Sequence, residues 1–303
     1  MKKISWVLIC CQMLVGMAFY TASVTVAHAV NQGVCDANDT AVSGATSWCT
    51  ATPAELTVNL YKFGLCKTLP TYNNYTDCQF FVNSTNLVSV TMQPDTTLAV
   101  GGDGEIDVGT YPYLVQLWGA EIEYKVVLPT FSAAQYGADG NQGRFCYTNG
   151  NRKLSDSANV NRNISCTTSA ELAYQNALPS KMLIVNLASG DRMTGSSSTG
   201  PWDAFLLDDV NTLEVIPSAT ATTNSQGGSG QEVLSSPAYL FSVMSLTNPV
   251  VITENTTSLN LSVKMTNAFK QEFYSASTHC YGSNTSCLGN VELMTLGFEF
   301  TAN

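Results

Sequence analysis

The stretch LTVNLYKFGL, residues 56–65, predicts the fold class of this chain. Its apolar residues alternate with polar ones, first on even and then on odd positions: Leu56, Val58, Leu60, then Tyr61, Phe63, Leu65. A period of two is typical of a β-strand with one buried face. Because a shift of one residue turns every later side chain to the other face, the phase change predicts a bulge, or a strand that changes sheets, near Leu60.

The same period recurs along the chain. Further segments rich in β-branched and aromatic residues predict strands at 78–82, 87–92, 97–100, 113–118, 122–127, 181–188, 239–244, 250–253, 259–265 and 291–301. One short helix is expected at 170–177, with Ser169 as its N-cap and Pro179 stopping it. We therefore expect an all-β protein: an antiparallel β-sandwich with long loops, local disulfides and at most one short helix.

The first 29 residues have the organisation of a signal peptide. Lys2 and Lys3 precede an apolar run over 4–19, and the segment closes on Ala-His-Ala at 27–29. Polar residues from Thr21 onward interrupt the run before it reaches the roughly 20 residues that span a membrane. The expectation is cleavage near Ala29, no stable membrane anchor, and a secreted or cell-surface protein.

Eight cysteines follow this segment, as four pairs of close neighbours: Cys35 and Cys49, Cys66 and Cys78, Cys146 and Cys166, Cys280 and Cys287. An even number of cysteines in an exported protein indicates a disulfide framework, because an oxidising compartment lets such bonds persist. The C-x2-C and C-x4-C spacings of thiolate metal sites do not occur among these eight. Pairing between nearest neighbours is preferred, while other connectivities stay open.

The chain is acidic, with 13 Lys and Arg against 23 Asp and Glu and a net charge of −10. Binding to nucleic acid depends on Lys and Arg releasing counterions from phosphates, so nucleic acid is excluded as a partner. Charged residues make up only 12% of the chain, against roughly 25% in ordinary soluble domains. That composition is typical of an exported β-protein whose solubility rests on hydroxyl and amide groups.

A turn at 108–111, Val-Gly-Thr-Tyr, leads through Pro112 into an alternating strand. Gly109 permits a positive backbone angle and Pro112 stiffens the start of the strand, so a tight turn is expected. This turn and strand resemble the last hairpin of transthyretin-like and related secreted bacterial β-sandwich surface proteins, over residues 54–127. The resemblance implies the fold class and brings no functional residues with it.

Two segments rich in Ser, Thr and Gly, at 189–201 and 217–237, predict long loops. We expect one β-sandwich domain over 30–303, in which the final strands complete the sheet begun by residues 56–127. Residues of about 129–236 then form an insertion. Two β domains that divide near residue 127 are the alternative.

Catalytic residues are sparse. After the signal segment the single histidine is His279, beside Cys280, and no G-x-S-x-G sequence accompanies it. Glu121 and Glu123 share one face of a predicted strand and have the chemistry of a glycosidase pair, although solvated surface carboxylates are far commoner. The prediction is that no residue is catalytic, with a glycoside hydrolase as the remote alternative.

One acidic turn is a calcium candidate. Asp103, Glu105 and Asp107 have Gly101, Gly102 and Gly104 around them, and hard cations bind several oxygens from a pliable loop. The spacing does not match an EF-hand, so a plain acidic turn is the alternative and no cofactor is required.

The chain's last predicted strand, 291–301, either closes its own sheet or pairs with the edge of a neighbouring copy. We expect a non-enzymatic exported surface or extracellular structural protein, an adhesin or filament subunit that assembles with copies of itself by strand pairing. The alternative is a glycan-binding β-sandwich module, assisted by calcium, in which exposed aromatic rings stack on sugars: Tyr111, Tyr113, Trp118 and Trp202.

Overall fold

The computed structural model describes residues 33–37, 47–101, 106–119, 121–153, 163–183, 192–207, 239–274, 287–293 and 296–303. These residues form 19 strands and one helix: β1 (Ser47–Ala51), β2 (Glu55–Cys66), β3 (Cys78–Met92), β4 (Thr97–Gly101), β5 (Gly109–Gly119), β6 (Glu121–Lys125), β7 (Gln135–Tyr136), β8 (Gln142–Gly143), β9 (Phe145–Thr148), β10 (Arg152–Lys153), β11 (Ile164–Thr167), α1 (Ala170–Asn176), β12 (Ser180–Leu183), β13 (Arg192–Ser196), β14 (Pro201–Leu207), β15 (Tyr239–Ile252), β16 (Leu259–Lys264), β17 (Phe269–Tyr274), β18 (Cys287–Leu293) and β19 (Gly297–Ala302). The all-β expectation is confirmed.

One large sheet organises the molecule. Its strand order is β10-β12-β6-β2-β5-β15-β14-β13, and β3 pairs with β2 along the opposite side. The long strand β2 therefore has β3 on one side, while β6 and then β5 follow one another along its other side. The β10–β12 pair is parallel, and the other pairs of this sheet are antiparallel.

A bulge at Tyr61 explains the phase change in β2. The register of β2 shifts between Leu60 and Lys62 against both β3 and β5. As a result, the apolar residues on either side of the bulge belong to the same core: Leu56, Val58, Leu60, Phe63 and Leu65. Tyr61 itself packs into a second cluster on the other face of the sheet. The predicted bulge near Leu60 is confirmed, and its effect is to keep both halves of β2 facing one core.

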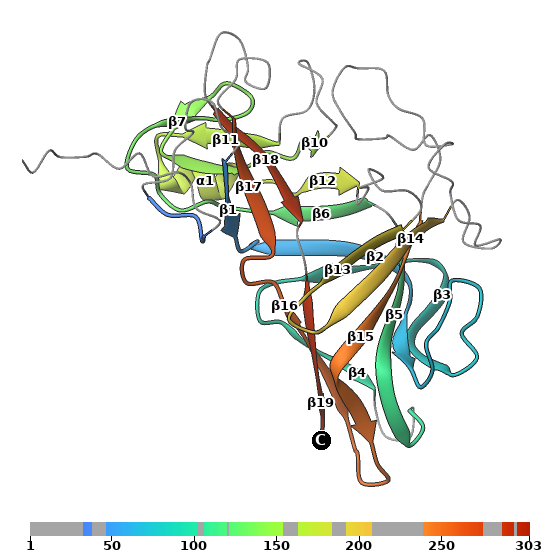
Figure 1. The fold of residues 1–303 in the computed structure, drawn as a ribbon. Coiled ribbons are helices and arrows are strands. Elements are labelled where there is room, and N and C mark those ends of the chain that lie inside the picture. The colour runs from blue at the N-terminus through green and yellow to red at the C-terminus, as the bar shows by residue number, and fades with distance from the viewer. Residues whose placement is uncertain are drawn as a thin grey trace, which may run out of the picture.

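Two smaller three-stranded sheets cover the core face of the large sheet. Figure 1 shows β1, β17 and β18 at one end of the molecule beside β6 and β12, and β4, β16 and β19 at the other end. Both contribute to the main core, with Phe269 and Phe273 from β17 and Leu261 and Val263 from β16. This arrangement is a β-sandwich, as the sequence predicts.

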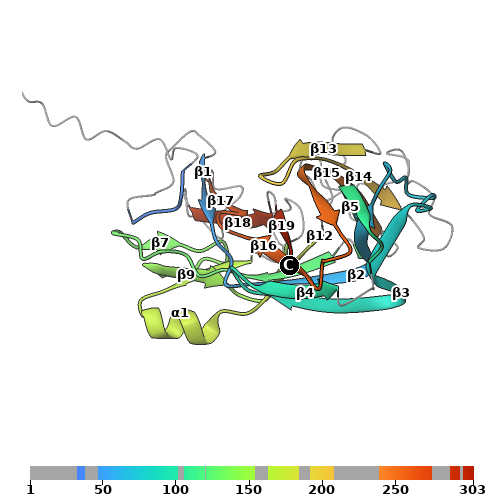
Figure 2. The same cartoon turned by 90° about the horizontal axis from the view of Figure 1, so that it is seen from below.

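The single helix matches its sequence signals. The Ser169 hydroxyl accepts a hydrogen bond from the backbone N–H of Leu172 at 3.4 Å, and α1 ends before Pro179. Its buried Ala173 packs with Tyr147 of β9. Figure 2 shows α1 beneath β9, at the end of the molecule away from β3 and β5.

Several predicted strand boundaries are wrong. The segments predicted separately at 78–82 and 87–92 are one strand, β3, and those at 239–244 and 250–253 are one strand, β15, with a register shift between Ser245 and Val250. The predicted strand at 291–301 is two strands, β18 and β19. Bulges and polar residues interrupt the alternation of apolar side chains, so the sequence pattern divides one strand into two. The strand itself continues, because the neighbouring strand still supplies backbone hydrogen bonds.

The loop predicted at 189–201 is partly wrong, because residues 192–196 form β13. This strand pairs with β14, and Gly195 lies opposite Trp202. A Cβ atom at Gly195 would be 2.4 Å from the Trp202 ring, so the indole covers the glycine. An aromatic ring that covers a glycine across the strand pair supports a segment whose own composition favours a loop. The loop predicted at 217–237 lies outside the described residues.

The expected insertion contributes strands to the large sheet. From within residues 129–236, β12 pairs with β6 and β14 pairs with β15, while β15 itself pairs with β5. The large sheet therefore takes strands from both sides of residue 127.

Three disulfides join the neighbours that the spacing favoured: Cys35–Cys49, Cys66–Cys78 and Cys146–Cys166. The second joins paired residues of β2 and β3, and the third joins paired residues of β9 and β11. Cys287 is also disulfide-bonded, whereas Cys280, its predicted partner, lies outside the described residues. These bonds fit an extracellular protein.

The predicted signal segment, 1–29, lies outside the described residues. Within the part of the chain that the structure describes, no helix is long and apolar enough to cross a membrane.

Candidate functional site

The Glu121 and Glu123 side chains do lie on one face of β6, and they share a cation. Lys181 of β12 places its Nζ 3.3 Å from Glu121 Oε1 and 2.9 Å from Glu123 Oε1. The hydrogen bond to Glu123, together with the charge of Glu121, raises the pKa of Lys181. All three groups are partly exposed, so this cluster is an ion-pair contact between β6 and β12.

The calcium candidate is described only in part. Asp103 and Glu105 lie outside the described residues. The Asp107 carboxylate accepts a hydrogen bond from Gln79 Nε2, and the Asp107 backbone N–H donates to Gln79 Oε1 at 2.7 Å. Asp107 thus ties the segment before β5 to β3. No group of three His, Cys, Asp or Glu side chains that could hold a metal ion occurs among the described residues, and His279 lies outside them.

The aromatic residues predicted to stack on sugars are largely structural. Tyr111 is fully buried and its hydroxyl donates to the Asp107 carbonyl oxygen at 2.6 Å. Trp118 is also buried, while Tyr113 and Trp202 are half-buried against the cores. Burial removes Tyr111 and Trp118 from any stacking platform, since a sugar must reach the ring face.

A different set of rings gathers on the outer face of the large sheet, opposite the main core. This outer aromatic cluster is built from β2, β3, β5, β14, β15 and the segment 67–77: Tyr61, Tyr72, Tyr75, Phe80, Tyr113, Phe205, Tyr239 and Phe241. Tyr72 and Tyr75 lie 6.4 Å and 6.1 Å from Phe241 between ring centroids. The Cys66–Cys78 disulfide closes the segment that carries these two tyrosines, so it holds their rings against the sheet.

One hydroxyl in the outer aromatic cluster is unsatisfied. The Tyr75 hydroxyl is buried and has no hydrogen-bond partner among the described residues, and burial raises the pKa of Tyr75 to about 12. Lys62 Nζ lies 5.7 Å from the Tyr75 ring centroid and 5.1 Å from that of Phe80, and it donates to Asn83 Oδ1 at 2.6 Å. Through these contacts Lys62 of β2 packs against Phe80 and Asn83 of β3 and against Tyr75.

The most distinctive surface feature is the edge of β3. Along one side β3 pairs with β2, and along the other it pairs with no strand in the described part of the chain. We call that second side the open edge of β3. Figure 1 shows β3 at the rim of the molecule, beyond β2 and β5. It is 15 residues long, whereas the edge strands β4 and β13 have five residues each.

The open edge of β3 has few of the features that protect exposed edges. Proteins commonly shorten such strands or place Lys, charged residues or Pro on them. The sequence of β3, CQFFVNSTNLVSVTM, contains no charged residue and no proline. Leu87 is 51% exposed and Val88 is 38% exposed. The blunting features are two register shifts against β2, one between Asn83 and Val88 and one between Phe80 and Val82, which divide the edge into shorter stretches.

The sequence pointed to the chain's last strand as the one that either closes its own sheet or pairs with a neighbouring copy. That strand, β19, pairs with β16 of its own chain along its whole length, and its other side pairs with no strand in the described part of the chain. The signal for β3 was present in the long uncharged run 78–92, but only the topology shows that this long strand has a neighbour on one side alone in the described part of the chain.

No family model matches this chain, and neither does any curated protein or solved structure. The resemblance to transthyretin-like proteins therefore stays a prediction.

Proposed function

We propose that the protein is a non-enzymatic extracellular structural protein, an adhesin or filament subunit, whose copies associate by strand pairing at the open edge of β3. The observation that carries the proposal is a 15-residue edge strand without charge or proline and with two exposed aliphatic side chains. Such an edge presents unpaired N–H and C=O groups, which are a template for another strand.

The partner that the proposal commits to is the β3 strand of a second copy. Two identical strands that meet antiparallel about a twofold axis are self-complementary, so one surface serves both subunits. Main-chain hydrogen bonds then supply affinity, and alternate side chains supply specificity. With Leu87 and Val88 beside the axis, their exposed apolar surface becomes buried as the two large sheets join into one.

The disulfide framework supports this reading in two ways. Cys66–Cys78 joins the end of β2 to the start of β3, so β3 is held to its own sheet before a partner strand arrives. A pre-ordered edge loses less conformational entropy on pairing. The same bonds suit a protein that works outside the cell, where they persist.

The test is the assembly state of the oxidised mature protein, measured by light scattering over a range of concentrations and by negative-stain microscopy. Dimers or longer assemblies should form as the concentration rises. Leu87→Lys places two like charges near the axis and should weaken association at least tenfold. Val251→Lys is the matched control, because Val251 is 53% exposed on β15.

Two outcomes would overturn the proposal. One is a protein that stays monomeric at every concentration. The other is an assembly that Leu87→Lys and Val251→Lys affect equally, since the contact would then lie elsewhere. Circular dichroism of both variants checks that they fold, and both substitutions are at exposed positions.

A further inference from the structure

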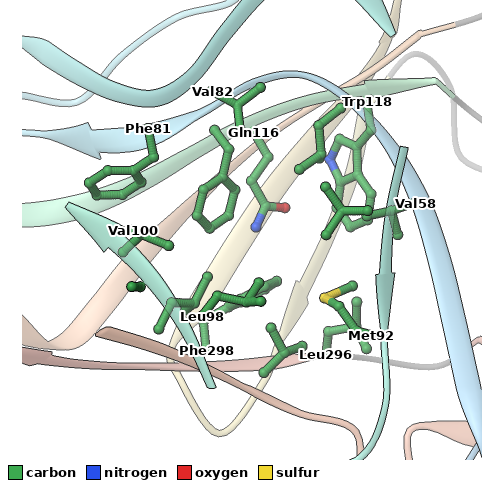
Figure 3. A pocket seen from close by; sticks show the side chains of 16 residues that line it. Val58, Phe81, Val82, Met92, Leu98, Val100, Gln116, Trp118, Leu296 and Phe298 are labelled. Carbon is green, nitrogen blue, oxygen red and sulfur yellow. The ribbon is translucent and has the colours of Figure 1, made fainter. Parts of the chain in front are cut away.

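The sandwich contains a cavity of about 250 Å³ between its two layers. Its walls come from β2, β3 and β5 of the large sheet and from β4, β16 and β19 of the covering sheet. Figure 3 shows these side chains directed toward one another around the space. Phe81 and Val82 of β3, Val100 of β4 and Phe298 near the chain end are only half-buried, so this part of the wall borders solvent.

All but one of the 16 lining side chains are apolar; the exception is Gln116. Alternation along β5 explains its place, because Leu114, Gln116 and Trp118 face the main core while Val115 and Leu117 face the outer aromatic cluster. Gln116 is only 4% exposed. A buried amide costs free energy unless its hydrogen bonds are satisfied, so a glutamine in this wall calls for a partner.

A short hydrogen-bond chain fixes how the amide is turned. Trp118 Nε1 donates to Ser242 Oγ at 3.3 Å, and Ser242 Oγ donates to Gln116 Oε1 at 3.1 Å. Because the single hydroxyl proton of Ser242 needs an acceptor, the oxygen of the Gln116 amide faces Ser242. The Nε2 group then points away from Ser242, and Figure 3 shows it among the apolar lining side chains. Among the described residues Nε2 has no hydrogen-bond partner, and it is not fully buried, so it is open to the cavity.

The volume of the cavity and the absence of charged residues from its described lining define which ligands would fit in it. An apolar protein cavity of about 150 Å³ accommodates benzene, so 250 Å³ has room for roughly ten non-hydrogen atoms. No Lys, Arg, Asp or Glu is among the described residues that line it, so a charged group inside would be unpaired. A neutral molecule with one hydrogen-bond acceptor satisfies both the apolar walls and Gln116 Nε2.

We propose that this cavity is a binding site for a small neutral apolar ligand that carries a carbonyl or ether oxygen, and that Gln116 Nε2 donates a hydrogen bond to that oxygen. The class includes medium-chain ketones, aldehydes and esters. The cavity lies on the core face of β3, whereas the proposed pairing uses the unpaired backbone groups of that strand, so the ligand is bound by a single copy of the chain.

The test uses 2-nonanone, which has a carbonyl acceptor, against nonane, which has none. Binding to the mature protein is followed by Trp fluorescence, since Trp118 lines the cavity, and by the shift in Tm. Saturable binding of 2-nonanone is expected, tighter than that of nonane. Gln116→Leu keeps the size of the side chain and removes the donor, so it should weaken 2-nonanone binding about tenfold and leave nonane binding unchanged.

A second variant tests the location. Val100→Phe places a ring in the half-buried part of the wall and should weaken both ligands at least tenfold, whereas Val251→Phe, at an exposed position on β15, should weaken neither. The proposal is overturned if neither ligand binds saturably, if Gln116→Leu affects the two ligands alike, or if Val100→Phe leaves both affinities intact. A crystal structure in which only ordered water occupies the cavity at saturating 2-nonanone would also overturn it.

Discussion

Gly64 lies just after the bulge in β2, at a point where the backbones of β2 and β3 approach closely. A Cβ atom added there would be 2.2 Å from the carbonyl oxygen of Gln79 and 2.9 Å from the Cα of Phe80. Both are backbone atoms, and the Cys66–Cys78 disulfide two residues away limits how far the strands can separate. Gly64→Ala therefore requires β3 to shift rather than a side chain to rotate.

The expected loss in the free energy of unfolding follows from that clash. Overpacking a well-packed site costs about 1–3 kcal/mol, and a clash with backbone belongs at the upper end. At about 2–4 °C for each kcal/mol in a domain of this size, a cost of about 2–3 kcal/mol should lower the Tm of Gly64→Ala by about 4–12 °C. The difference in Tm between the variant and the parent is measured by following thermal unfolding of the oxidised proteins with near-ultraviolet circular dichroism.

Gly119→Ala is the matched control within the same sheet. At Gly119 an added Cβ would be 3.5 Å from Leu87 Cδ2 and 3.6 Å from Asn59 Cβ, which are ordinary contacts. Because alanine reduces the entropy of the unfolded chain, this variant should be neutral or stabilised by about 0.4–1 kcal/mol. A Gly64→Ala variant as stable as the parent, or equal losses at both glycines, would show that β2 and β3 do not approach as described.

Three further predictions concern buried tyrosines and a disulfide. Tyr75→Phe removes a hydroxyl that has no partner in the described part of the chain and should be neutral or slightly stabilising. Tyr124→Phe removes a buried donor to the Val291 carbonyl at 2.8 Å and should cost about 1–3 kcal/mol in urea unfolding. Burial raises the pKa of Tyr75 from 10.0 to about 12, so the unfolded chain ionises first; stability should be constant below about pH 10 and fall toward pH 12, and Tyr75→Phe should reduce that fall. Replacing Cys66 and Cys78 together by alanine opens a loop with a sequence separation of 12 and should cost about 3 kcal/mol; an unchanged midpoint in denaturant would contradict this.

Local patterns in the sequence identified features that depend on neighbouring residues only. The phase change between Leu60 and Tyr61 indicated the bulge, Ser169 and Pro179 bounded the helix, and short spacings favoured the three disulfides that the structure contains. Each rests on a local physical cause: the alternation of side chains along a strand, the unsatisfied N–H groups of a helix end, or the short loop that a disulfide closes.

Other features depend on which distant segments meet. Residues 192–196 look like a loop until Trp202 covers Gly195, and 269–274 and 145–148 become strands through partners that no local pattern names. The burial of Trp118 and Tyr111 likewise depends on the smaller sheets that cover the large one. These rings, which the sequence offers as a sugar-binding platform, belong to the core instead.

By itself, then, the sequence determined the all-β class, the bulge, the helix and the local disulfides, because these follow from periodicity and chain proximity. Only the tertiary structure decided that β3, the longest strand, keeps an open edge in the described part of the chain while the short β19 pairs with β16, because edges are defined by the pairing of all strands together. It likewise decided that Gln116, an isolated polar residue in an apolar strand, lines a cavity, because a cavity exists only where two layers fail to fill the space between them.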